Sequence, residues 1–292
     1  VLMKYAAVAL ACLLGLAFAQ EEEEKPPQEG EAGEEGAEGE EGGEKKPPEE
    51  KPGDPKQILA DLILANHGKN VTGVDMAARA ALIWARSPKD TSDEAKAAEV
   101  EAKIEEIGKE LTDSVKVVKG NYGSLLIIVE ALGELRSKAG VRTLKRFAFQ
   151  KRLKDESEQK IQAAALIGVG RIADPRDLKE FEEASKSENA EIAKAAYEAF
   201  GQYATAKAKV RKDCAETLMK RMEMEFPSSG GGGQGGGGGV SKEKQERWAE
   251  LSPAMIGSMK AVCRQPTIND MPNWREWWKE NKKKPWKDDD ES

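Results

Sequence analysis

The sequence predicts an all-α protein, an α-solenoid of antiparallel helix hairpins that ends in a tryptophan-rich cap. Only 5% of the residues are aromatic, and the composition favours helices over a β-sandwich. Apolar residues recur at intervals of three and four from residue 57 onward, which is the period of an amphipathic helix. A short unit built around a glycine recurs at spacings of 37 and 31 residues, which is typical of helical repeats.

Residues 1–19 have the pattern of a secretory signal peptide. Lys4 precedes an apolar run at residues 6–16, and Ala17-Phe18-Ala19 has the small-x-small form of a signal peptidase site. The run is too short to form a stable membrane span. We therefore expect cleavage after Ala19, export to the periplasm or outside of a bacterial cell, and no transmembrane span thereafter. A lipoprotein signal that places a lipid on Cys12 is the alternative.

Residues 20–56 form an acidic tract rich in Glu, Gly and Pro, which we expect to be a disordered linker. The tract holds 15 acidic and 5 basic residues, with almost no apolar side chains to offset the entropy of ordering. The whole chain has a formal charge of −7, so residues 57–292 carry a net charge of +2. That surplus is too small to favour nucleic acid as a partner. Residues 287–292 form a second, short acidic tail.

The helical region is expected over residues 57–286. The first helix starts near Ile58, and residues 77–85 form a second apolar helix that Pro88 ends. Residues 92–118 predict a long amphipathic helix, with Gly120 as its C-cap. Further helices are expected over residues 127–132, 161–169 and 192–200, each followed by one copy of the glycine unit.

The three copies of the unit read apolar, Gly, polar, apolar. Small residues in the preceding helices would let neighbouring helices approach closely. After the second copy, Asp174 and Pro175 predict a new helix, with Asp as N-cap and Pro at the first position. The copies are Leu132-Gly133-Glu134-Leu135, Val169-Gly170-Arg171-Ile172 and Phe200-Gly201-Gln202-Tyr203.

This unit resembles the HEAT repeat, including its phycobilisome-lyase-like bacterial relatives. The second copy matches best because it keeps the turn formed by Asp174 and Pro175. The resemblance covers residues 121–226 well and residues 57–118 loosely. It implies a curved, right-handed stack of helix hairpins that binds other macromolecules, and it specifies no reaction. An ordinary helical bundle without repeats is the alternative.

The C-terminal region combines a glycine tract with clustered tryptophans. The tract at residues 227–239 predicts a flexible loop that joins two helices of one hairpin, the second of them over residues 242–262, and a domain boundary is the alternative. Four of the six tryptophans follow, and Asn273 and Glu276 form a capping pair for a short helix. Three tryptophans would share one face of that helix. The four are Trp274, Trp277, Trp278 and Trp286.

Two interpretations of these tryptophans stay open. They either cap the end of the solenoid, as terminal repeats require, or form an aromatic patch for carbohydrate, peptide or a membrane surface. Residues 267–278 are also similar to the tail of secreted HEAT-repeat proteins of planctomycete-type bacteria.

A helix expected over residues 141–153 carries the best candidate for an acidic partner. Such a partner would be an acidic protein, a cell-surface polymer or the chain's own tract at residues 21–50. A simple solvated face is the alternative. The candidate residues are Arg142, Lys145, Arg146, Phe149 and Arg152.

Cysteine and histidine usage excludes several chemistries. Signal cleavage would leave Cys214 and Cys263, an even pair that predicts a disulfide in an exported protein, or else two separately buried thiols. His67 is the only histidine, so a multi-His metal site is excluded, and its position beside Gly68 indicates a helix end. The sequence contains no nucleophile elbow, haem motif or calcium loop. We therefore expect no cofactor and no metal.

These observations favour an exported, non-enzymatic scaffold or adaptor that binds a protein or an envelope polymer. The alternative is a HEAT-like enzyme of lyase or hydrolase type that uses carboxylates such as Asp174 or Asp177 as acid and base.

Overall fold

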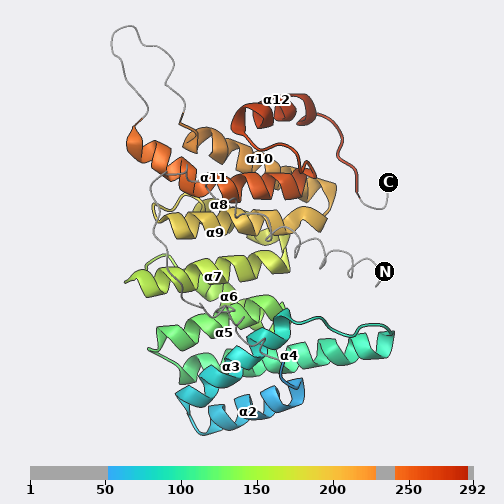
Figure 1. Ribbon diagram of the computed structural model, residues 1–292, viewed down its shortest axis with the longest axis vertical. Coiled ribbons are helices and arrows are strands. Elements are labelled where there is room, and N and C mark those ends of the chain that lie inside the picture. Colours follow the sequence, from blue (N-terminus) through green and yellow to red (C-terminus); the bar gives the residue numbers. More distant parts are fainter. Residues whose placement is uncertain (1–51, 228–240, 289–292) are drawn as a thin grey trace, which may run out of the picture. The chain divides into compact units, whose positions relative to one another are not determined.

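The computed structural model describes residues 52–227 and 241–288 (Figure 1). The expected signal peptide, nearly all of the acidic linker, the glycine tract from residue 228 and the tail from residue 289 lie outside the described residues. In the described part the chain is entirely helical, with no strand. None of the described helices is both long and apolar enough to span a bilayer.

The described residues contain eleven α-helices and three short 3-10 helices. The α-helices are α2 (Pro55–His67), α3 (Val71–Arg86), α4 (Glu94–Val117), α5 (Tyr122–Leu135), α6 (Val141–Ala148), α7 (Glu156–Ile172), α8 (Leu178–Ala184), α9 (Ala190–Gly201), α10 (Ala208–Glu225), α11 (Lys242–Cys263) and α12 (Met271–Asn281). The 3-10 helices are η1 (Lys138–Gly140), η2 (Pro175–Asp177) and η3 (Gln202–Thr205).

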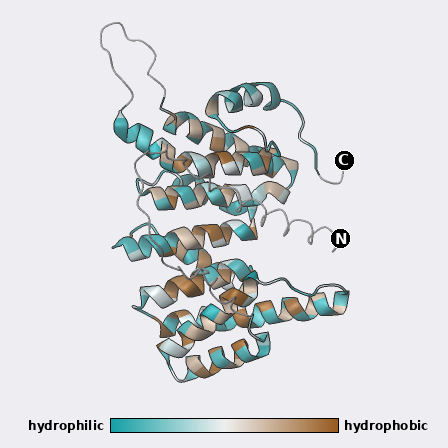
Figure 2. Ribbon diagram, viewed as in Figure 1, coloured by the Kyte–Doolittle hydropathy of each residue, from teal (hydrophilic) through white to brown (hydrophobic). Residues whose placement is uncertain are grey.

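The helices of the unit that spans residues 49–292 pack in chain order. One series consists of α3, α5, α7, α9 and α11, each packed against the next (Figure 1). The other helices lie beside this series. Helices α2 and α4 pack on each other, α6 packs on α7, α8 on α9 and α10 on α11. Most helices carry both hydrophobic and hydrophilic positions, as amphipathic helices between core and solvent do, whereas α5 is hydrophobic along most of its length (Figure 2).

Most helix starts follow from side chains that the sequence supplies. Eight of the α-helices begin after an Asp, Asn or Ser whose side chain accepts a hydrogen bond from a backbone N–H in the first turn. Asp174 does the same for η2, where Pro175 takes the first position as predicted, and the chain continues directly into α8. These caps satisfy N–H groups that otherwise have no partner in the helix.

The glycines of the repeated unit lie where successive helices approach most closely. A Cβ added to Gly133 in α5 would come within 2.8 Å of the Cα of Gly168 in α7. A Cβ on Gly170 would lie 2.7 Å from the Cα of Ala199 in α9, and one on Gly201 would lie 2.8 Å from Oγ of Ser258 in α11. These distances confirm that small residues let neighbouring helices approach closely.

The polar position of the unit also connects helices. Glu134 follows Gly133, and its Oε1 lies 3.1 Å from Nη2 of Arg171, the residue after Gly170. The same oxygen lies 3.1 Å from Nε of Arg86. A single carboxylate therefore joins the C-terminal ends of α3, α5 and α7.

Three predicted helix boundaries are wrong. The long helix α4 has Val118 as its C-cap, and Gly120 lies two residues beyond it at φ +87°. The capping pair of Asn273 and Glu276 does not form, because α12 starts earlier, with Asp270 as its N-cap. The helix expected over residues 141–153 ends at Ala148.

A contact with α7 accounts for the early end of α6. The side-chain amide of Gln162 donates hydrogen bonds to the carbonyl oxygens of Ala148 (2.9 Å) and Gln150 (2.8 Å). Since these bonds satisfy carbonyls that a longer helix would pair internally, the chain can leave the helix at Phe149 without unpaired buried groups.

Candidate functional site

The basic face predicted around α6 is only partly a surface. Arg142 and Arg146 are exposed and lie four residues apart on the helix. Arg152 is also exposed, but it lies in the loop after α6 and not on the helix, which corrects the prediction. Three exposed arginines therefore remain on this side.

Lys145 is held in an ion-pair cluster between α6 and the turn at η2. Its Nζ lies 2.7 Å from Oδ1 of Asp177 and 3.3 Å from Oδ2 of Asp174. Hydrogen bonds from Arg176, together with Lys145, hold the pKa of Asp174 well below its usual range. Burial raises the pKa of Asp177 and outweighs the opposite effect of Lys145. This lysine therefore joins α6 to the turn at η2, and its role in binding a partner stays a prediction.

Phe149 belongs largely to the core. Its ring packs edge-on against Phe181, with 5.7 Å between centroids. Phe181 in turn contacts Phe200 and Tyr203 in the same edge-on manner. The aromatic ring next to the arginines thus stabilises the packing of α6, α8 and α9.

The C-terminal tryptophans divide into one core residue and three that are half-buried. Trp274 has no exposed surface, whereas Trp277, Trp278 and Trp286 keep part of theirs. Trp277 packs edge-on against Trp274 at 5.6 Å and against Trp286 at 6.1 Å. The three tryptophans of the expected row all lie on α12, and Trp286 from the segment after α12 joins them in one cluster.

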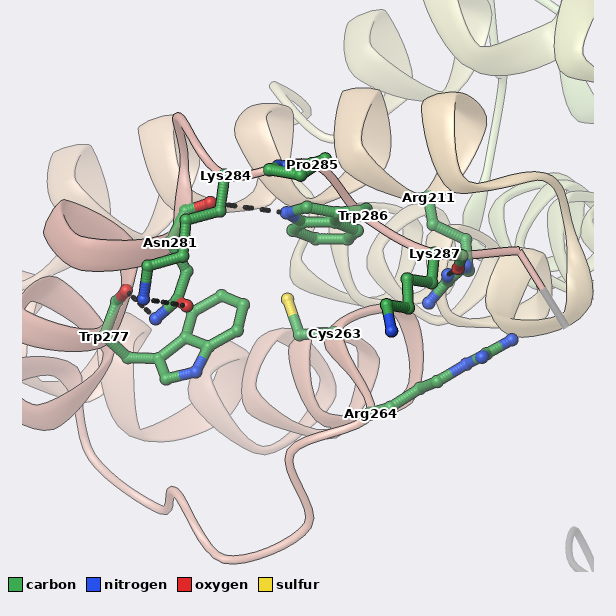
Figure 3. A pocket seen from close by; sticks show the side chains of 9 residues that line it. All are labelled: Arg211, Cys263, Arg264, Trp277, Asn281, Lys284, Pro285, Trp286 and Lys287. Carbon is green, nitrogen blue, oxygen red and sulfur yellow. Dashed lines mark hydrogen bonds between the residues drawn. The ribbon is translucent and has the colours of Figure 1, made fainter. Parts of the chain in front are cut away.

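A pocket of about 250 Å³ lies next to this cluster (Figure 3). The rings of Trp277 and Trp286 form two walls, and the Cys263 side chain points into the space between them. Asn281 contacts both tryptophans: its side-chain amide donates to the backbone carbonyl of Trp277 at 2.8 Å, and its backbone carbonyl accepts from Nε1 of Trp286 at 3.4 Å.

Four cationic side chains complete the lining of this pocket. Arg211 from α10 is only 3% exposed, and its guanidinium donates to the carbonyls of Val262 (3.3 Å) and Lys287 (2.6 Å). It also lies over the ring of Trp286, at 5.7 Å from the centroid. No carboxylate is among the described residues that line the pocket. The four cations are Arg211, Arg264, Lys284 and Lys287.

Both cysteines of the helical region are buried free thiols in the structure. Cys214 lies in α10 and Cys263 at the end of α11, two helices that pack on each other. Burial raises the pKa of Cys263 to about 12 and moves the pKa of Cys214 in the same direction. The disulfide between them stays a prediction.

A second, larger concavity crosses three helices of the packed series. This groove of about 370 Å³ has a floor of alanines and aliphatic side chains and a rim of charges of both signs. Burial raises the pKa of Glu198 on the rim. The lining residues are Leu126 and Glu130 from α5, Lys160, Ala163, Ala164 and Ile167 from α7, and Glu191, Lys194, Ala195 and Glu198 from α9.

Sequence analysis missed both concavities, because each is assembled from residues far apart in the chain. The carboxylates considered for catalysis, Asp174 and Asp177, line neither of them. His67 lies in the last turn of α2, next to the C-cap Gly68, as predicted. The described residues contain no group of three or more His, Cys, Asp or Glu side chains able to hold a metal ion.

No protein-family model, curated protein or solved structure matches the chain. A functional interpretation therefore depends on the geometry of its own residues.

Proposed function

We propose that the chain is an exported, non-enzymatic scaffold, secreted or periplasmic, whose helices form a HEAT-like solenoid with a tryptophan-rich C-terminal cap. Its partner would be a protein or an acidic envelope polymer. The order of packing supports the solenoid, since each helix of the series α3, α5, α7, α9 and α11 packs against the next helix of that series.

The repeated unit gives further support to this architecture. Its glycine removes the side chain that would hold α5, α7, α9 and α11 apart, and its polar residue joins neighbouring repeats through Glu134 and Arg171. The glycine positions thus make similar close contacts in successive repeats, which is what a stack of similar hairpins requires.

The groove across α5, α7 and α9 is the observation that carries the scaffold proposal. Its small floor residues, Ala163 and Ala164, leave room for side chains of another molecule, and its rim offers both Lys and Glu for polar contacts. An apolar floor with a charged rim is the usual anatomy of a protein interface. We therefore favour a protein segment as the occupant of this groove.

A pair of alanine-to-arginine variants tests the proposal. Ala163→Arg places a long side chain in the groove, whereas Ala98→Arg adds the same charge on an exposed face of α4. The mature wild-type chain and both variants would be used to capture partners from an envelope extract, after thermal unfolding has shown that all three are folded.

We expect one polypeptide to be recovered by the wild type and by Ala98→Arg, and to be lost with Ala163→Arg. Equal recovery by all three chains would remove the groove as the binding surface. Cleavage or chemical modification of the captured partner by the wild type would refute the non-enzymatic assignment.

A further inference from the structure

The pocket beside Cys263 offers ring faces that are fixed before any ligand arrives. Trp277 and Trp286 meet at an interplanar angle of 68°. The Trp277 ring packs edge-on against the buried Trp274, and Nε1 of Trp286 donates to the backbone carbonyl of Asn281. Both rings are half-buried and so retain accessible surface. Because the rings are already ordered, a ligand that packs on them loses little additional side-chain entropy on binding.

The charged side chains among the described residues that line the pocket are all cationic. Arg211 is fixed at the inner side by its bonds to backbone carbonyls, while Lys284 and Lys287 are exposed at the rim. The neighbouring Asp288 directs its carboxylate to the backbone N–H of Ala208 at the start of α10. The exposed Lys284 and Lys287 at the rim favour a ligand that carries a negative group.

Ring faces and positive charge together select a ligand with both an apolar face and a negative group. The volume of about 250 Å³ is below the range of drug-sized pockets and fits a single ring-sized unit. The C–H face of a sugar ring packs on the negative face of an indole, and a carboxylate on that sugar would reach the cations. We propose that this pocket binds one acidic sugar unit of an envelope polysaccharide, such as a uronic acid.

Two other anionic partners fit this pocket less well. Single-stranded nucleic acid needs a basic groove with several stacking platforms along the backbone, whereas this site is one small pocket with two tryptophan walls. Insertion into an anionic membrane needs tryptophans that project from the surface. Here Trp274 is fully buried and its three neighbours pack against one another.

The inference deepens the proposed function and rests on it, because export brings the chain to the place where such polymers occur. It assigns the polymer to the C-terminal pocket and leaves the groove across α5, α7 and α9 to a protein.

Binding of a trimer of galacturonic acid to the mature chain tests the proposal. The affinity would be measured by titration calorimetry and by the change in tryptophan fluorescence, with maltotriose as the neutral comparison. Lys284→Ala/Lys287→Ala removes two exposed cations from the pocket rim. Lys109→Ala/Lys119→Ala removes two exposed cations near the end of α4 and is the matched control.

We expect the acidic trimer to bind the wild type and the control equally, and to bind the pocket variant about five- to tenfold more weakly. Added salt should weaken binding, and maltotriose should bind poorly. Equal affinity for both trimers, an unaffected pocket variant, or binding only of single-stranded DNA or of anionic vesicles would each overturn the proposal. The groove variant Ala163→Arg should bind the acidic trimer normally, so failure of the groove and failure of the pocket are distinguishable.

Discussion

Replacing Gly170 by alanine tests the close approach of α7 and α9. The new Cβ would lie 2.7 Å from both the Cα and the Cβ of Ala199, whereas non-bonded carbons prefer about 3.5–4.0 Å. The helices would therefore have to separate by about 1 Å. Overpacking of this kind lowers the free energy of unfolding by about 1–3 kcal/mol, while alanine gains about 1 kcal/mol over glycine inside a helix.

The backbone of Ala199 cannot rotate away from the new methyl group. The loss of unfolding free energy should therefore lie in the upper part of the range for overpacking. The expected net loss for Gly170→Ala is then about 1–2 kcal/mol. Gly257 in α11 supplies the matched control, since a Cβ there would have no atom within 4 Å. Gly257→Ala should therefore raise stability by about 1 kcal/mol.

Urea unfolding followed by far-ultraviolet circular dichroism measures both variants. The two midpoints should move in opposite directions, and the melting temperature should change by about 2–4 °C per kcal/mol for a domain of this size. If Gly170→Ala stabilised the chain as much as Gly257→Ala does, the account of the glycine contacts would be wrong.

Three further predictions concern single side chains. Asp174→Asn keeps an N-cap for η2 but loses the charge that pairs with Lys145 and Arg176, so we expect about 1 kcal/mol less stability at pH 7. The fold lowers the pKa of Asp174, so its carboxylate stabilises the chain above the ordinary Asp pKa and this stabilisation is lost as the pH falls. In acid unfolding curves, the stability of the variant should therefore approach that of the wild type. A difference in stability that stays constant with pH would contradict this. Trp274→Ala should lower stability by about 3–5 kcal/mol, and Trp278→Ala by less, because Trp274 alone is fully buried; equal losses in urea unfolding would exclude that difference. The two buried thiols should react slowly with iodoacetamide at pH 8 in the native chain, because burial raises their pKa values. Rapid native labelling would refute this, and thiol counting after denaturation without reductant gives two if the cysteines are free and none if they form the predicted disulfide.

Local patterns predicted most of the helices because local chemistry determines them. Apolar periodicity predicted the positions of α2, α4 and α11 to within a few residues. The N-cap at Asp174 could be predicted from its own side chain and from the proline that follows it. The error at α12 was also local: Asp270 followed by Pro272 is a valid start signal that the pairing of Asn273 with Glu276 obscured.

The remaining errors come from contacts between distant parts of the chain. The end of α6 depends on Gln162, which lies on the next long helix, and no periodicity within residues 141–153 contains that information. In the same way, the sequence of α6 indicates that Lys145 is a surface cation, because the ion pairs with Asp174 and Asp177 form only when the chain folds. The pocket needed Arg211 from α10 to meet Trp286 from the segment after α12.

The glycine contacts have a consequence for recognition as well as for packing. Where Gly133 meets Gly168, the interface is made of backbone, which has no rotamers to rearrange. We therefore expect the part of the groove between α5 and α7 to change little in shape when a partner binds. A partner would be chosen by how well it already fits this surface, as in rigid docking, and the entropy lost on association would fall mainly on the partner's side.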